Sequence, residues 1–375
     1  MMTKKPKIIF VVNEDWAFMT LRLPMAKAAL AMGGEVIVAT RVNEHRAVME
    51  DMGFRVAHVP FERGGINPFK ELSVVWQLAR LFRAERPDII HTIALKAILD
   101  GSIAALAVPK ATVINTFTGM GAVFIGSSGL GLVRKFLISA FHLLMGRNKA
   151  HVIVQNKDDL VLLLELGIAR AQRTVLIAGS GVNMQEFPVT PEPTGTPVVT
   201  MVARLLWDKG MGELVSAAKL LVERGCEVKI QVVGDPDPQN PQSVDETTLQ
   251  GWKTEGVVDF LGHCTDIATI WKNSHIAILP SYREGLPKSL LEAASCGRAL
   301  IATDVPGCRE LVIDGENGLL VPARDAKSLA DAIERLVNDA ELRVELGVGA
   351  RKSVENSYAD TVVMAAVRKL YGDVI

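Results

Sequence analysis

The chain has 375 residues, of which 49% are hydrophobic and 5% aromatic, so it can bury two sizeable cores and is neither disordered nor fibrous. Its formal net charge of -1 gives no overall attraction to nucleic acid, and a nucleic-acid-binding protein is therefore disfavoured. The cysteines show no C-x-x-C pairing and no histidine at zinc-site spacing, which predicts free thiols in a reducing cytosol.

The first half of the chain alternates short apolar stretches with helical ones. Continuous Val/Ile runs of this kind are typical of a parallel sheet that is covered by helices on both faces. The predicted strands lie at 7–12, 35–40, 55–60, 87–93, 112–117, 151–156 and 174–179. We therefore predict a doubly wound α/β domain, in which ligands bind beyond the carboxyl ends of the strands.

The carboxyl end of the first predicted strand lacks the glycine pattern of a dinucleotide site. The residues there are Asn13, Glu14 and Asp15, where G-x-G-x-x-G would begin, and this disfavours a nicotinamide-dependent enzyme. His91 stands at the end of another predicted strand, so it is a candidate for ligand contact. A buried histidine whose hydrogen bonds are satisfied within the core is an equal alternative.

The segment Ala122–Ala150 begins with a glycine-rich stretch and continues as a strongly apolar helix with cations toward its ends. A core helix explains the apolar residues. The alternative is a helix that rests on an anionic membrane surface, where each cation contributes on the order of 1 kcal/mol. The N-terminus lacks the form of a signal peptide, and no apolar run reaches the roughly eighteen residues of a membrane span. A cytoplasmic protein that attaches to the membrane surface is the resulting expectation.

The proline-rich stretch Phe187–Pro197 interrupts every periodicity and is predicted to be a linker. Beyond it, strands are predicted at 197–205, 227–235, 257–262, 275–281, 298–304 and 318–322, followed by a helical tail from about Asp325. The second half is therefore predicted to be another doubly wound domain.

The stretch Leu279–Asp304 carries the clearest functional pattern. A buried strand ends at Pro280, a loop follows, and a helix is predicted from Lys288 to Cys296, where Gly297 closes it. The N-terminus of such a helix presents backbone N–H groups and the positive end of the helix dipole, and so it binds anions, phosphates above all.

Four charged residues lie near this predicted anion site. Glu284 is in the loop, and Glu292 falls one turn into the helix among apolar residues, either on a narrow solvent face or reserved for a ligand. Arg204 and Lys209 follow the first strand of the second domain, where both could face the same anion. A charge-assisted hydrogen bond to phosphate contributes roughly 1.5–3 kcal/mol.

Asp235 and Asp237 form an Asp-x-Asp triplet with Pro236, which invites interpretation as a Mn²⁺ or Mg²⁺ site. We favour a rigid proline-containing turn, because the flanking residues are ordinary loop residues. Arg204 and Lys209 already supply the positive charge that a metal would bring. No metal ligand and no cofactor are therefore predicted.

Three stretches resemble the retaining family 4 glycosyltransferases, which have the GT-B fold. Glu284 to Glu292 is similar to the family's Glu-x7-Glu signature, Ala203–Gly210 to its G-R-L-x-x-x-K-G motif with alanine in place of the first glycine, and Gly307–Pro322 to the run that follows. The resemblance implies two Rossmann-like domains that face a cleft. These would be an acceptor-binding domain at 1–187, a nucleotide-sugar-binding domain at 188–360, and a last helix at 361–375 that crosses back to the first domain.

The resemblance also implies residue roles. Glu284 would contact the donor sugar, Glu292 would hold the ribose hydroxyls of the nucleotide, and Arg204 and Lys209 would hold its diphosphate. The backbone of the loop and first helical turn would hold the diphosphate as well; these residues are Gly285, Leu286, Pro287, Lys288 and Ser289.

In the first domain, the sequences PDIIHTIALKAILDG and NTFTGMGAVF resemble the branch that extends saccharides on polyprenyl diphosphate. The resemblance implies that Asn13, His91, Lys96 and Thr118 lie on the acceptor side. A solvated lysine is the alternative for Lys96. Members often carry glycines and a histidine where this chain has Asn13–Asp15 and Thr118, so the residue opposite the donor sugar is not assigned.

These observations predict a glycosyltransferase that moves a hexose or N-acetylhexosamine from a UDP-sugar to an undecaprenyl-diphosphate-linked saccharide at the inner membrane surface. Two alternatives stay open. A UDP-sugar epimerase of GT-B fold would need no acceptor, and a non-catalytic nucleotide-sugar-binding protein would bind the donor without turnover.

Overall fold

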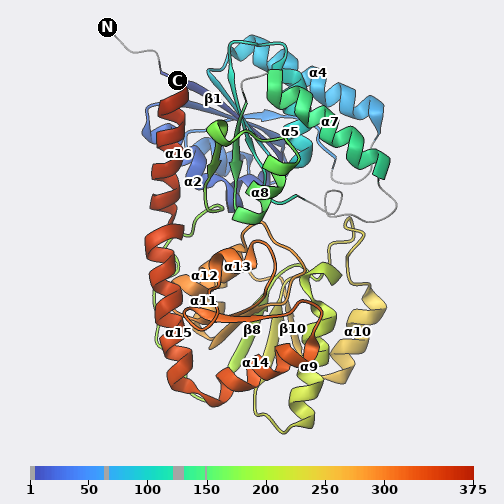
Figure 1. Ribbon diagram of the computed structural model, residues 1–375, viewed down its shortest axis with the longest axis vertical. Coiled ribbons are helices and arrows are strands. Elements are labelled where there is room, and N and C mark those ends of the chain that lie inside the picture. The colour runs from blue at the N-terminus through green and yellow to red at the C-terminus, as the bar shows by residue number, and fades with distance from the viewer. Residues whose placement is uncertain (1–4, 63–66, 121–130, 148–149) are drawn as a thin grey trace. The chain divides into compact units, whose positions relative to one another are not determined.

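The computed structural model describes residues 5–62, 67–120, 131–147 and 150–375. The chain forms two compact units (Figure 1), the first made of Met1–Ser180 with Thr361–Ile375 and the second of Gly181–Asp360. The first unit thus ends at Ser180, a few residues before the boundary predicted at 187, and the last helix belongs to it.

The first unit contains the predicted parallel sheet of seven strands in the order β3-β2-β1-β4-β5-β6-β7. Its strands are β1 (Lys7–Glu14), β2 (Glu35–Arg41), β3 (Arg55–His58), β4 (Ile89–Ile93), β5 (Thr112–Thr116), β6 (His151–Val154) and β7 (Thr174–Leu176). The apolar residues of β1 alternate between two cores, because successive strand residues point to opposite faces. Ile9 and Val11 enter one core, and Ile8, Phe10 and Val12 enter the other.

Helices cover both faces of this sheet, as a doubly wound fold requires. One core is closed by α4 (Pro68–Glu85), α5 (Leu95–Ala105), α7 (Gly131–Arg147) and α8 (Lys157–Glu165). The other is closed by α1 (Asp15–Leu21), α2 (Leu23–Ala31), α3 (Arg46–Asp51) and the C-terminal α16 (Asp360–Val374).

The second unit contains the second predicted sheet, with parallel strands in the order β10-β9-β8-β11-β12-β13. These are β8 (Val198–Val202), β9 (Lys229–Val233), β10 (Asp259–Gly262), β11 (Ile276–Leu279), β12 (Ala299–Thr303) and β13 (Gly318–Val321). Its helices are α9 (Met211–Glu223), α10 (Glu246–Glu255), α11 (Ile267–Lys272), α12 (Lys288–Ser295), α13 (Cys308–Leu311), α14 (Ala326–Asn338) and α15 (Ala340–Ser353).

The proline-rich stretch at 187–197 does not act as a free linker, since it is fastened to the second unit. The buried guanidinium of Arg298 donates to the backbone oxygen of Thr190, and Arg343 forms an ion pair with Glu192 at 3.0 Å. The prolines that break periodicity therefore fix an extended strap, because two buried cations need the carbonyl and carboxylate oxygens that the strap presents.

Of the segment Ala122–Ala150, the structure describes helix α7 and Ala150. Residues up to 130, with most of the glycine-rich start, and residues 148–149 lie outside the described residues. Phe141, Leu144 and Met145 of α7 are buried in the core of the first unit, as the core-helix interpretation expects. Phe136 and Leu143 are exposed on the same helix. None of the described helices combines the length and apolar composition needed to cross a bilayer.

Candidate active site

Four loops meet at the carboxyl edge of the second sheet. They follow β9, β8, β11 and β12, which are neighbours in the sheet, and so the fold brings together segments that are distant in the sequence. Arg204 and Lys209 follow β8, Asp237 follows β9, Glu284 follows β11, and Gly307 follows β12.

The centre of this edge is an ion pair between Lys209 and Glu284. The Lys209 Nζ lies 2.5 Å from the Glu284 Oε1, which also accepts a hydrogen bond of 2.7 Å from the Ser281 hydroxyl. The two charged side chains are only 19% and 13% exposed. An ammonium has three N–H donors, so the contact with Glu284 leaves Lys209 with capacity to bind a further acceptor.

The loop that carries Glu284 is held by its backbone. The Glu284 amide donates to the Pro306 oxygen at 3.0 Å, and the Tyr282 amide donates to the Asp208 oxygen at 2.9 Å. Gly307, at φ +82°, packs so closely that a Cβ would lie 2.4 Å from the Glu284 oxygen. Only glycine fits there, so the Gly307 turn also fixes the position of the Glu284 backbone.

Helix α12 begins directly after this loop, with Pro287 at its N-cap. No side chain of the described residues caps this end, and its first turn carries no acidic residue. Gly285, Leu286, Lys288 and Ser289 are half-buried and Pro287 is buried. The helix end therefore offers the positive end of its dipole to an anion at the same sheet edge as Lys209.

Arg204 also lies at this edge, where it is paired with an acid that the sequence interpretation treated as a turn residue. Its Nη1 lies 2.5 Å from the Asp237 Oδ2, and the Arg204 side chain is 46% exposed. Asp237 is largely buried, and its backbone amide donates a hydrogen bond of 3.0 Å to the Ser243 hydroxyl oxygen. The guanidinium keeps further N–H groups for a ligand, because Asp237 engages one end of it. Asp237 therefore orients Arg204.

Glu292 lies inside α12 and is only 8% exposed, so it does not occupy a solvent face of the helix. Burial raises its pKa, while the Lys288 ammonium, 3.5 Å away, acts in the opposite direction. A carboxylate that is largely stripped of water gains more from hydroxyl donors than a solvated one would. The geometry thus suits a partner with hydroxyl groups.

Comparison with known protein families gives two matches that follow one another along the chain. Residues 7–156 match the model described as "Glycosyl transferase 4-like", and residues 196–339 match "Glycosyl transferases group 1". A Campylobacter jejuni relative, N,N'-diacetylbacillosaminyl-diphospho-undecaprenol alpha-1,3-N-acetylgalactosaminyltransferase, is 28% identical over 98% of this chain and 99% of its own. The chain belongs to the family 4 glycosyltransferases.

Further relatives agree with this assignment. An Escherichia coli UDP-Gal:alpha-D-GlcNAc-diphosphoundecaprenol alpha-1,3-galactosyltransferase is 25% identical over 87% of this chain and 85% of its own. Among solved structures, Anabaena HepE in complex with UDP and glucose is 18% identical with a TM-score of 0.80, covering 98% of this chain and 100% of that one. Sucrose-phosphate synthase from Thermosynechococcus elongatus is 22% identical with a TM-score of 0.79, covering 98% and 99%. These structures confirm the predicted GT-B fold.

In the first unit of the glycosyltransferase, the predicted acceptor-side residues have different surroundings. Asn13 lies near the end of β1, and its buried amide oxygen has no hydrogen-bond partner among the described residues. Thr118 is half-buried just beyond β5. Lys96 is not free in solvent, because its Nζ lies 2.8 Å from both the Glu62 oxygen and the Glu71 carboxylate. Its charge is therefore already balanced.

His91 is a core residue whose hydrogen bonds are satisfied within the protein. Of the two interpretations that the sequence left open, the structure thus favours the core histidine over the ligand contact. Its ring is fully buried, with Nδ1 2.6 Å from the Tyr371 hydroxyl and Nε2 2.6 Å from the Thr116 hydroxyl. Tyr371 belongs to α16, so His91 fastens the C-terminal helix to the first sheet. The ring is not available to contact an acceptor saccharide, because both of its nitrogens are hydrogen-bonded inside the core.

His91 also makes the first unit sensitive to acid. Burial and the nearby Arg22 lower its pKa to about 3, so it stays neutral when the unfolded chain gains a proton near pH 6.5. Its stabilising contribution is complete above pH 6.5 and falls with pH by up to about 1.4 kcal/mol per unit. Denaturant titrations at pH 7 and pH 5 should show a smaller pH dependence for His91→Gln than for the unaltered protein. Equal pH dependence would contradict this account.

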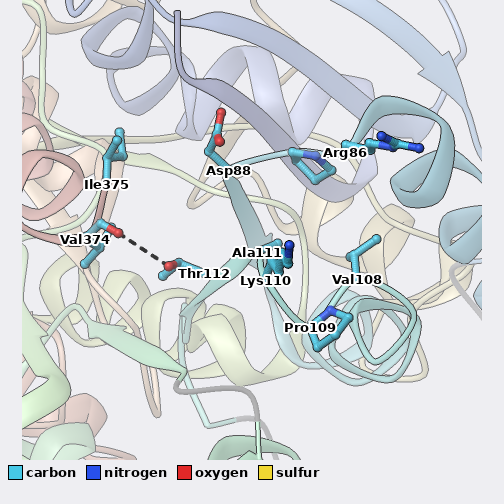
Figure 2. Close-up of a pocket in the computed structure, with 10 residues that line it drawn as sticks. Arg86, Asp88, Val108, Pro109, Lys110, Ala111, Thr112, Val374 and Ile375 are labelled. Carbon is cyan, nitrogen blue, oxygen red and sulfur yellow. Dashed lines mark hydrogen bonds between the residues drawn. The ribbon is translucent and has the colours of Figure 1, made fainter. Parts of the chain in front are cut away.

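A pocket of about 450 Å³ lies at the edge of the first sheet formed by the amino ends of its strands (Figure 2). Arg86, Asp88 and Lys110 line it together with Val374, whose oxygen accepts a 3.5 Å hydrogen bond from the Thr112 hydroxyl. It borders the amino ends of β4 and β5, the edge where doubly wound folds do not place their ligands. We therefore do not include it in the active site.

The sequence interpretation missed two residues of the loop that follows β11, Ser281 and Tyr282. Ser281 orients Glu284, while the Tyr282 hydroxyl donates to Glu213 at 2.7 Å and its ring lies 4.5 Å from the Arg324 guanidinium. Burial and the Glu213 contact raise the pKa of Tyr282 to about 12, so it remains a hydrogen-bond donor. Their place directly after β11 was the available signal.

Proposed function

We propose that this glycosyltransferase moves a hexose or N-acetylhexosamine from a UDP-sugar to an undecaprenyl-diphosphate-linked saccharide, with retention of anomeric configuration. The reaction would serve the assembly of a cell-surface glycan at the cytoplasmic face of the membrane. The observation that supports it best is the half-buried Lys209–Glu284 pair beside the end of α12, which no side chain of the described residues caps.

This pair suits a donor whose diphosphate leaves. The Lys209 ammonium and the α12 dipole would stabilise the negative charge that develops on the diphosphate as the sugar bond breaks. Arg204, oriented by Asp237, would add a second cation. Glu284 holds Lys209 and Asp237 holds Arg204 before any donor binds, so these side chains would need little reorganisation during the reaction.

Glu284 has a different task in this proposal. Its carboxylate is held by Lys209 and Ser281, so it is placed to accept hydrogen bonds from the hydroxyls of the transferred sugar. The leaving diphosphate would itself assist removal of the acceptor proton on the same face. No carboxylate nucleophile is then required, and Glu284 acts by orientation and electrostatics.

The acceptor class is supported by the relatives. The Campylobacter jejuni and Escherichia coli enzymes are both named for saccharides on diphospho-undecaprenol, and the Escherichia coli enzyme is named for a UDP-linked sugar. The Campylobacter match spans nearly the whole of both chains. The acceptor class is therefore supported by matches over 98% and 87% of this chain.

The proposal is tested by incubating the purified protein with a panel of labelled UDP-sugars and a membrane extract. We expect label from one UDP-sugar to enter the lipid-linked fraction. A new UDP-sugar epimer formed without extract would instead identify an epimerase. Binding of UDP-sugars with neither product would identify a non-catalytic binding protein.

We propose further that transfer needs no divalent metal. Lys209, Arg204 and the α12 terminus supply positive charge at the site, and Asp237 is already paired with Arg204. Activity should therefore keep at least about half of its value when EDTA is added, since no diphosphate contact would be lost. Complete loss with EDTA, restored by Mn²⁺, would contradict this and would make Asp235 and Asp237 candidate ligands.

A further inference from the structure

Helix α4 (Pro68–Glu85) is apolar on two different faces. Val74, Leu78 and Phe82 form the buried stripe that packs in the core of the first unit. Phe69, Leu72 and Trp76 form a second stripe that is 84%, 68% and 59% exposed. Folding explains the first stripe and leaves the second in water, where a cluster of large apolar side chains marks an interaction surface.

The exposed stripe continues onto α5, which packs against α4 (Figure 1). Leu72, Trp76 and Ala79 of α4 line a groove of about 390 Å³ with Ile103 of α5 and Leu106 at the C-cap of α5. Ile103 and Leu106 are themselves exposed. We call the surface formed by Phe69, Leu72, Trp76, Ile103 and Leu106 the α4–α5 patch.

The charges around the α4–α5 patch are cationic. Arg80 lies over the Trp76 ring at 5.7 Å, and Arg83 lines the groove. Neither arginine forms an ion pair with any described residue. The acids of α4 are occupied elsewhere, because Glu71 pairs with Lys96 and Glu85 pairs with Lys7 and Arg55.

We propose that the α4–α5 patch docks the protein on an anionic lipid bilayer, an inference that rests on the proposed lipid-linked acceptor. Exposed aromatic and aliphatic side chains beside unpaired arginines are the features by which helices lie in the interface of anionic membranes. Trp76 and Arg80 combine an apolar body with a polar end, which suits the headgroup level.

Topology places this surface well for such an acceptor. Helix α4 starts after the carboxyl end of β3 and runs back toward the start of β4, so its Phe69 and Leu72 end lies toward the carboxyl edge of the sheet. That edge is where Asn13 and Thr118 lie. An acceptor with its lipid chain in the bilayer would thus meet the protein on the side where the saccharide must bind.

A second copy of the chain fits the patch less well. In a twofold dimer the same patch would face itself, and this would bring unpaired Arg80 and Arg83 side chains together across the contact. Like charges that face one another in a contact destabilise it. Anionic lipid headgroups instead neutralise those arginines.

Vesicle sedimentation tests the proposal with a matched pair of double variants. Leu72→Gln/Trp76→Gln should lower partitioning onto phosphatidylglycerol-containing vesicles by about tenfold or more, because two apolar side chains no longer enter the interface. Val344→Gln/Val348→Gln on α15 changes side chains of similar exposure, 54% and 65%, in the second unit and should leave partitioning unchanged. Arg80→Gln/Arg83→Gln should remove most of the preference for anionic over neutral vesicles and most of its salt sensitivity.

Fluorescence separates docking from a general loss of fold. Brominated lipids should quench tryptophan emission of the unaltered protein. Trp76→Phe, which keeps an aromatic side chain, should still bind vesicles but lose most of that quenching. Quenching that persists in Trp76→Phe would overturn the proposal, because the lipid would then contact another tryptophan.

Three further outcomes would also overturn it. The first is an equal loss of vesicle binding in the α15 control. The second is a loss of vesicle binding only in the α7 variant Phe136→Gln/Leu143→Gln. The third is vesicle binding that survives Leu72→Gln/Trp76→Gln while concentration-dependent self-association of the protein disappears. Transfer to a short-chain acceptor dissolved in detergent should be unchanged in Leu72→Gln/Trp76→Gln. If the unaltered protein transferred sugar but did not bind vesicles, docking would be refuted and the proposed function would stand. If it bound vesicles but transferred no sugar, the proposed function would be refuted and docking would stand.

Discussion

Replacing Lys209 by alanine should lower kcat/KM for sugar transfer by about a hundredfold or more. In the proposed mechanism the variant loses one charge-assisted contact to the diphosphate, which accounts for roughly 1.5–3 kcal/mol. The variant also leaves Glu284, which is only 13% exposed, without its partner ammonium, and this would disturb the group that we propose contacts the sugar. Initial rates at limiting UDP-sugar measure the effect.

A double-mutant cycle separates the chemical role of Lys209 from its structural one. Lys209→Ala should lower the free energy of unfolding, and the added change Glu284→Ala should restore part of it, because no partly buried carboxylate is left unpaired. Activity should stay low in the double variant. Lys219→Ala, which breaks the exposed pair with Glu255, is the matched control and should leave both quantities nearly unchanged. Recovery of activity together with stability would show that Lys209 serves the fold alone.

Glu284→Gln and Glu292→Gln should have different kinetic effects. Glu292 would contact the ribose, a part of the donor that does not change in the reaction, so its variant should weaken UDP and UDP-sugar alike by about ten- to a hundredfold. Glu284 would contact the sugar that develops charge, so its variant should lower kcat by a similar factor and leave UDP affinity nearly unchanged. Calorimetry with UDP beside initial rates measures both.

Glu292→Gln should also stabilise the ligand-free protein at neutral pH. Burial raises the pKa of Glu292, so ionising it in the folded state costs free energy as the pH rises through that pKa. The amide removes this cost, and the gain in stability should shrink toward acid pH.

If Glu284→Gln lost UDP binding while Glu292→Gln kept it, the proposed orientation of the nucleotide would have to be reversed.

The strands and the central loop were predictable because their signals are local. Most predicted strands are short runs rich in apolar residues, and each of them forms a strand in the structure. Glu284 and Glu292 belong to a short motif around one helix end. The pairing of Arg204 with Asp237 was not predictable, because the two residues meet only through the adjacency of β8 and β9. For the same reason, the strap at 187–197 was interpreted as a linker, since its partners Arg298 and Arg343 are more than a hundred residues away.

The sequence also does not show which side chains of a strand or helix are buried in the core. A histidine at a strand end is equally consistent with a site or a core, and only the position of Tyr371 on α16 decides for His91. The second apolar stripe of α4 was hidden as well, because apolar residues at helical spacing are expected to enter a core. The structure shows that one stripe is enough to anchor α4, and this leaves Phe69, Leu72 and Trp76 exposed.

The most direct test is the anomeric configuration of the product, followed by NMR in one reaction with a ¹³C-labelled UDP-sugar and an undecaprenyl-diphosphate-linked saccharide. We predict that the anomeric signal of the donor is replaced by that of a lipid-linked glycoside of the same configuration, with one UDP released for each linkage formed. Lys209→Ala should nearly abolish the signal of the glycoside and the release of UDP. An inverted anomer, or label that ends as an epimer or as free sugar while the acceptor stays unchanged, would contradict the account.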